Sequence, residues 1–213
     1  MDEPELIGSD KNLLSSPRID NLASVAAIVE TMCEKTTGDS LVVAGLFDNE
    51  EIGSRSKQGA DSSLLKDIIM KIGAAFGMEE TEVNDMLRGG FLLSIDGAHA
   101  VHPNYTNKSD ITNDVILGKG ITVKTSASQR YLSDSEATAV VMQLCKKTDI
   151  PYQVQVNRSG MPGGQTLGPI VVSYLPMQGA DIGIPMLAMH SARELADMRD
   201  YQALVMFLKI FSA

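Results

Sequence analysis

Three carboxylates crowd into the stretch LFDNEEIGS at residues 46–54, where Asp48, Glu50 and Glu51 directly follow an apolar run. Like charges side by side repel each other and raise each other's pKa. A fold tolerates this crowding when a positive charge lies among the acids, or when water solvates all of them. Taken alone, the stretch is typical of a solvated turn, so the choice depends on the rest of the sequence.

Further acids, and all of the histidines, follow predicted strands or a predicted turn elsewhere in the chain. These residues are Asp20, Asp96, His99, His102 and His190. Sites in open α/β sheets form at the carboxyl ends of strands, so we expect these side chains to meet at one edge of a sheet. Each also has a plainer interpretation, since an aspartate can cap a helix and a histidine can lie in a loop or in the core.

Carboxylates combined with imidazoles favour a divalent metal, and zinc above all. A pair of metals needs a carboxylate that bridges them, and their charge would supply the positive partner that the crowded acids lack. The joint pattern therefore predicts a zinc site, although no single residue does so by itself.

Two periodicities indicate which elements position these residues. Short apolar or alternating runs predict strands at 41–47, 89–96, 120–126, 152–157 and 179–185. Apolar residues three and four apart predict helices at 20–33, 59–77, 133–148 and 191–211. Strands that alternate with helices predict an α/β fold in one domain, residues 1–213, with a mainly parallel central sheet flanked by helices. The longest predicted loop is 103–120.

Composition narrows the class of protein. The 213 residues are 44% hydrophobic and carry a formal net charge of −9, with no tryptophan, which argues against a nucleic-acid surface. No apolar run is long enough to span a membrane, and the acidic N-terminus lacks the features of a secretory signal. We therefore expect a cytoplasmic protein, with Cys33 and Cys145 as buried thiols in a reducing compartment.

Six motifs occur in order along the chain: SPRIDNLAS, DNEEIGSRSKQGA, DGAHAVHPNY, KTSASQRY, MPGGQTLGPI and IPMLAMHSARE. Together they resemble the second half of the catalytic domain of the M18 family, the aspartyl aminopeptidases, from about Ser16 to the C-terminus. The resemblance implies a dinuclear zinc peptidase of phosphorylase/hydrolase-like architecture, truncated on its N-terminal side. Its substrate would be a peptide with Asp or Glu at the N-terminus.

The resemblance also implies a role for each candidate. Asp20 would bridge two zinc ions. Glu51 and His190 would complete the ligands of one ion, and Asp96 would bind the other. Glu50, which lies beside a metal ligand, would be the general acid/base.

Other positions resemble the family's substrate pocket. Lys124 and Tyr131 would contact the acidic side chain, and His99 would face the substrate or support a metal ligand. Backbone N–H groups at Gly163 and Gly164 could hold the peptide. The plainer interpretations are a solvated lysine at a strand end and a tight glycine turn.

The family also uses a histidine from further upstream and a dimerisation domain, and these residues contain neither. One zinc position would thus have Asp20, Glu51 and His190, and the other only Asp20 and Asp96. We expect one ion to bind well, the second weakly, and activity of this chain alone to be low or nil. Alternatives are a catalytically impaired piece that keeps the fold and one metal, and a metal-free α/β binding domain. An exposed sheet edge would favour a homo-oligomer.

Overall fold

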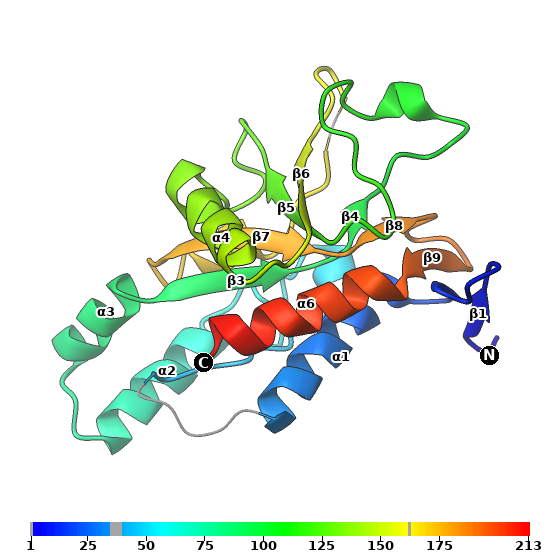
Figure 1. The fold of residues 1–213 in the computed structure, drawn as a ribbon. Helices are drawn as coiled ribbons and strands as arrows, with labels where there is room; N and C mark the ends of the chain where they lie inside the picture. Colours follow the sequence, from blue (N-terminus) through cyan, green and yellow to red (C-terminus); the bar gives the residue numbers. More distant parts are fainter. Residues whose placement is uncertain (1, 35–39, 162) are drawn as a thin grey trace.

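The computed structural model describes residues 2–34, 40–161 and 163–213. Across these residues the strands form one four-stranded and one five-stranded sheet, and helices pack around them (Figure 1). The strands are β1 (Glu5–Ile7), β2 (Leu13–Ser16), β3 (Phe91–Ile95), β4 (Ala98–His99), β5 (Ile121–Thr125), β6 (Tyr152–Val156), β7 (Gln178–Gly183), β8 (Pro185–Leu187) and β9 (Glu194–Asp197). The helices are α1 (Ile19–Glu34), α2 (Leu64–Ala75), α3 (Glu80–Arg88), α4 (Ser135–Lys147), α5 (Gly168–Val171) and α6 (Met198–Phe211), with 3-10 turns η1 (Glu50–Ile52) and η2 (Thr106–Lys108).

The four-stranded sheet is the central one and has the order β3-β7-β5-β6. Strand β3 is parallel to β7 and β5 is parallel to β6, whereas β5 and β7 are antiparallel. Two of these three pairings are parallel, which confirms the predicted α/β fold with a mainly parallel central sheet. The antiparallel pairing places the carboxyl end of β5 opposite those of β3 and β7. None of the acids and histidines that we expect to meet follows β5, so this reversal does not separate them.

The five-stranded sheet, in the order β1-β2-β9-β8-β4, was not predicted from the sequence. It is antiparallel except where β4 pairs with β8. The parallel pair β3 and β7 continues into β4 and β8, and Asp96 donates its N–H to the Ile182 carbonyl at 3.0 Å between them. We call this junction of the two sheets, residues 96–97 and 183–184, the seam.

Side-chain alternation gives the central sheet one apolar and one polar face. Ile121 and Val123 of β5 are fully buried in a core that also contains side chains of α4 and α6. Burial of such side chains stabilises the fold by roughly 1.5–3 kcal/mol each. On the other face, Lys124 lies between its register partners, Asp181 of β7 and Gln155 of β6. Lys124 and Gln155 of this row line the candidate site.

The predicted helices agree with the structure to different extents. The prediction at 20–33 corresponds to α1, and the one at 133–148 to α4, whose N-cap Asp134 accepts the Ala137 N–H. The prediction at 59–77 is too long, because α2 covers only Leu64–Ala75. None of the described helices is long and apolar enough to cross a membrane.

Two sequence-based predictions are wrong. Residues 41–47 form no strand, and Leu41, Val43 and Leu46 are exposed, because no described strand pairs with this segment. Cys33 is also exposed, near the end of α1, whereas Cys145 is buried as expected. Burial raises the pKa of the Cys145 thiol to about 11, which makes it a poor nucleophile near neutral pH.

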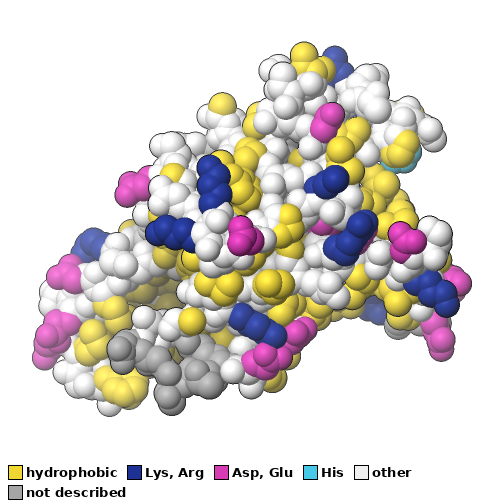
Figure 2. All heavy atoms as spheres, in the orientation of Figure 1, with side chains coloured by type: hydrophobic (Ala, Val, Ile, Leu, Met, Phe, Trp, Pro, Cys, Tyr) yellow, Lys and Arg dark blue, Asp and Glu magenta, His cyan; other side chains and the backbone are white. Residues whose placement is uncertain are grey.

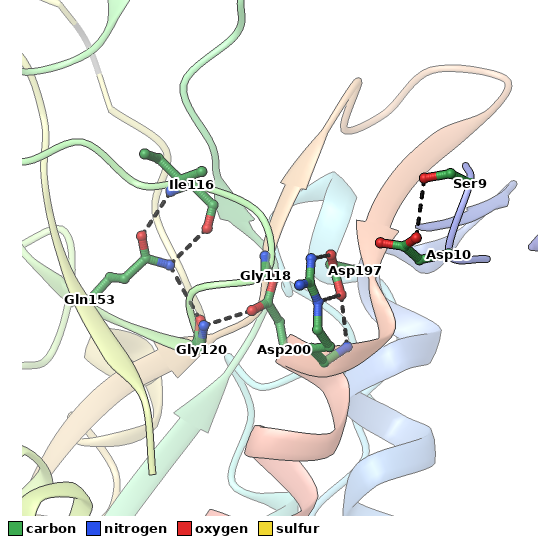
Figure 3. A network of polar contacts seen from close by, with 9 residues as sticks. Ser9, Asp10, Ile116, Gly118, Gly120, Gln153, Asp197 and Asp200 are labelled. Atoms are coloured by element: carbon green, nitrogen blue, oxygen red, sulfur yellow. Dashed lines mark hydrogen bonds and ion pairs between the residues drawn. The ribbon is translucent and has the colours of Figure 1, made fainter. Parts of the chain in front are cut away.

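The predicted long loop at 103–120 is confirmed and contains only the short turn η2. Figure 3 shows how its end is fastened to α6. The buried Asp200 carboxylate accepts the N–H groups of Gly118 and Gly120 at 2.7 and 2.6 Å. Gln153 of β6 exchanges two hydrogen bonds with the backbone of Ile116. These contacts fix the entry of the chain into β5, which carries Lys124.

Candidate metal centre and active site

A cavity with about 460 Å³ of empty space, part of it open to solvent, lies beside the seam. It is lined by Asp20, Glu50, Glu51, Asp96, Gly97, His99, Lys124, Tyr131, Gln155, Gly164, Gln165, Thr166, Met189 and His190. The fold thus brings together segments from near residue 20 to residue 190. Most of the residues singled out from the sequence lie in this one place.

Asp20, Glu51 and His190 form the tightest group in the cavity. His190 Nε2 is 3.1 Å from Asp20 Oδ2 and 3.2 Å from Glu51 Oε2. One ligand atom from each of the three residues lies within 4.8 Å of the others. Asp20 Oδ1 is buried and has no hydrogen-bond partner among the described residues. Two carboxylates and an imidazole whose ligand atoms converge, one of the carboxylates also having an oxygen without a hydrogen-bond partner, fit a divalent cation such as zinc.

The crowding of acids seen in the sequence is present in the structure. Burial, followed by the neighbouring Asp96 and Glu51, raises the pKa of Asp20 to about 7, and His190 acts in the opposite direction. Burial and the same two neighbours raise the pKa of Glu50 to about 7, opposed by Lys124 and His190. These values belong to the metal-free protein. A cation at the site would favour the ionised carboxylates and relieve the repulsion.

A tight turn presents the two adjacent glutamates. Glu50 and Glu51 lie in η1, between Asn49 and Gly53, whose φ angles are 63° and 98°. Asparagine and glycine are the residues that enter this left-handed region most readily. The Asn49 carbonyl accepts the Ser54 N–H at 2.8 Å and closes the turn. The sequence DNEEIGS therefore encodes a turn geometry as well as a cluster of charge.

Lys124 is buried in the cavity floor, with only 2% of its side chain exposed, so it is not a solvated lysine. Its Nζ lies 3.2 Å from Asp96 Oδ2 and 5.5 Å from the centre of the Tyr131 ring. On the other side is Asp181, fully buried, where burial raises the carboxyl pKa and Lys124 lowers it. A buried ammonium at the wall of a cavity can bind an anionic group of a ligand.

The remaining predicted substrate residues divide between the cavity and its surroundings. His99 and Gly164 line the cavity. Desolvation in the cleft, then Lys124 and His190, lowers the pKa of His99, which favours the neutral imidazole. Gly163 is not part of the lining, and its carbonyl accepts a hydrogen bond from Arg130. His102 also lies outside the lining and accepts the Asn104 N–H.

Sequence reasoning missed Gln155, Gln165, Thr166 and Met189 in the lining. Gln155 is 6% exposed, and its Oε1 has no hydrogen-bond partner among the described residues. The alternating run YQVQV predicted its strand, but the pairing of β6 with β5 was needed to place it beside Lys124. A polar residue on a strand carries no signal of its own about which neighbour it will face.

The family model described as aminopeptidase I zinc metalloprotease (M18) matches residues 1–212. The chain belongs to the M18 family. A probable M18 family aminopeptidase 2 from Clostridium novyi is 42% identical over 196 residues, which cover 92% of this chain and 45% of the relative. An aspartyl aminopeptidase from Caenorhabditis elegans is 35% identical over 209 residues, which cover 95% of this chain and 44% of the relative. This M18 chain therefore spans about half the length of the curated relatives it matches.

Solved structures agree with membership of the M18 family. The cryo-EM structure of the Ape4 and Nbr1 complex matches with a TM-score of 0.89 and 33% identity, over 99% of this chain and 41% of that one. An M18 family aminopeptidase from Thermotoga maritima gives a TM-score of 0.90 at 23% identity, over 99% of this chain and 48% of that one, which supports the fold alone. The mApe1 dodecamer of S. cerevisiae gives 0.80 at 26% identity, over 99% of this chain and 48% of that one.

Proposed function

We propose that this chain is the C-terminal portion of the catalytic domain of a zinc aminopeptidase that removes N-terminal Asp or Glu from peptides. The observation that carries the proposal is the convergence of Asp20, Glu51 and His190, each with one ligand atom within 4.8 Å of the others, in the cavity that also holds Glu50 and Lys124. Family membership supports aminopeptidase chemistry, and the buried lysine supports the acidic substrate.

Asp20, Glu51 and His190 would hold the zinc ion. When bound, zinc supplies polarisation of a carbonyl and acidification of water. Glu50 lines the same cavity without belonging to the ligand group. Its carboxylate can accept a proton from the attacking water and return it to the leaving amine, which is the task of a general acid/base.

Lys124 would bind the carboxylate of the substrate's N-terminal side chain. It is held between Asp96 and Asp181 and against the Tyr131 ring, so its ammonium is fixed in position before a substrate arrives. His99 and the backbone at Gly164 line the approach to this position. An uncharged N-terminal side chain would leave the buried ammonium without this partner, which disfavours such substrates.

A second zinc position would use Asp20 as the bridge and Asp96 as a further ligand. Within the described residues, one group of three metal-ligating side chains is present, and Asp96 is not in it. Asp96 instead pairs with Lys124. This observation favours the second candidate function, an impaired form of the enzyme that retains the fold and a single metal.

Metal content and hydrolysis together test the proposal. The purified chain is assayed with an Asp-linked chromogenic amide, with and without added Zn²⁺, and its bound zinc is measured by mass spectrometry. We expect Glu50→Gln to lower turnover by roughly a hundredfold or more while zinc content stays unchanged. Zinc binding without hydrolysis would favour the impaired form, and the absence of zinc binding would contradict both candidates.

A further inference from the structure

Glu194 lies outside the proposed ligand set but contacts the backbone of two of its members. It is the first residue of β9, and 3% of it is exposed. Its Oε2 accepts the backbone N–H of Asp20 at 2.9 Å, and its Oε1 accepts the backbone N–H of His190 at 2.7 Å. A single buried carboxylate thus joins two chain segments that meet only in the folded protein.

The two residues that it joins need an external restraint. The His190 side chain is 61% exposed, so packing does little to fix its ring. Its backbone also has a φ of 65°, in the left-handed region that non-glycine residues seldom adopt. The hydrogen bond to Glu194 holds this backbone conformation. The hydrogen bond to Asp20 holds the first turn of α1 at a fixed place relative to it.

Glu194 is itself held on a rigid element. Strand β9 lies between β2 and β8, and Glu194 is the register partner of Ser16. The preceding Arg193 donates to the Ser15 carbonyl at 2.9 Å, which adds a side-chain contact to the pairing of β9 with β2. Sites built on such elements keep their geometry better than sites built on loops alone.

We propose that Glu194 is a positioning residue, whose two hydrogen bonds hold Asp20 and His190 at the spacing that a divalent cation requires. The inference rests on the proposed metal centre. Groups that orient metal ligands typically contribute tenfold to hundredfold to metal affinity. A carboxylate has two acceptor oxygens and can serve both N–H groups. The glutamine amide of the same size has one acceptor oxygen and opposes one N–H with its own donor.

The test is the zinc affinity of Glu194→Gln, measured by competition with a chromophoric chelator well below the variant's unfolding temperature. We expect affinity roughly 10–100-fold below that of the parent chain. The matched control is Glu30→Gln, which changes a carboxylate that accepts the Tyr201 hydroxyl at 3.0 Å on α1, outside the cavity lining. Its zinc affinity should equal the parent's even where its stability falls. The visible spectrum of bound Co²⁺ should change in Glu194→Gln alone.

The outcomes separate this inference from the proposed function. If the parent chain binds no zinc, the metal centre itself is wrong and the role of Glu194 is wrong with it. If the parent binds zinc and Glu194→Gln binds it equally tightly, only the positioning role is overturned. If Glu194→Gln does not fold, Glu194→Asp decides in the same way, because it keeps both oxygens but withdraws them from the two amides.

Discussion

Single residues in the cavity carry charges that the fold holds in unfavourable surroundings. Asp20, Glu50 and Asp96 line one cavity, and the buried Lys124 pairs with Asp96 and acts on Glu50. Charge of this kind costs stability unless it is paired, so it marks a site selected for chemistry more than for stability. The consequences can be tested one side chain at a time.

Lys124→Met should change substrate preference. Methionine fills a similar volume without the charge, so the pocket loses its partner for a substrate carboxylate while its packing is largely kept. We expect the ratio of kcat/KM for Asp-linked over Ala-linked amides to fall by roughly 10–100-fold. The control is Lys119→Met, at an exposed position outside the cavity lining. An unchanged ratio in Lys124→Met would contradict the assignment.

The pH dependence of stability should reveal the strained carboxyl group in the metal-free protein. The pKa of Asp20 is about 7 in the folded chain, against 3.8 for the ordinary group, so the folded state binds this proton more tightly than the unfolded state. Its contribution to stability is therefore greatest when it is protonated and is lost as pH rises from about 4 to about 7. After chelator treatment, Asp20→Asn should lose less stability than the parent over that interval in urea titrations. Equal losses would show that Asp20 is not the group responsible.

At the scale of elements, residue patterns along the chain predicted those helices and strands whose type does not depend on a particular partner strand. The alternating and apolar runs predicted β3, β5 and β6, and helical spacing predicted α1 and α4. Strand β9 was hidden within a region predicted as helix, because its strand conformation depends on pairing with β2 and β8. The run at 41–47 has strand-forming residues but no described partner strand, so it forms no strand.

The candidate site was predictable as a list of residues more than as a geometry. Asp20, Glu51 and His190 were recognisable as candidate metal ligands from their residue types and from motif resemblance. Their assembly depends on the seam and on Glu194, neither of which has a local signature. The antiparallel pairing of β5 with β7 was not predicted, because a run of strand-forming residues carries no signal about the direction of its neighbour.

The hydrogen bonds that hold the 103–120 loop against α6 give a prediction at the scale of elements. In Asp200→Asn the side chain keeps one acceptor oxygen, which can bind the N–H of either Gly118 or Gly120. Its NH₂ group then faces the remaining N–H, donor against donor. Because the site is fully buried, we expect a loss of roughly 1–3 kcal/mol in the free energy of unfolding, measured by urea denaturation. Asp114→Asn, at an exposed position in the same loop, is the control and should match the parent. Equal stability of both variants would show that the loop is held by other contacts.

At the scale of the whole molecule, exposed apolar surface favours self-association and the net charge opposes it. Leu41, Leu46 and Phe76 are 55%, 53% and 81% exposed. Figure 2 shows further hydrophobic side chains open to solvent near α2 and α3. The formal net charge of −9 keeps copies of the chain apart at low salt. The S. cerevisiae mApe1 to which this chain is similar was solved as a dodecamer.

Self-association should therefore rise with salt and with protein concentration, since salt screens the repulsion and leaves the apolar attraction. Sedimentation velocity measures this directly. Leu41→Asp should reduce association, whereas Leu6→Asp, at a 48% exposed position on β1, should reduce it less. A chain that stays monomeric at every salt and protein concentration would exclude a role in self-association for the exposed apolar run at 41–47.

The seam gives the molecule a mechanical property. Asp20 and His190 follow strands of the five-stranded sheet, whereas Lys124 and Gln155 belong to the central sheet. A peptide whose amino end contacted the first pair, and whose side chain contacted the second, would bridge the two sheets across the seam. The protein with peptide bound would then bend less at the seam than the protein without it, and its stiffness would report on occupancy of the site.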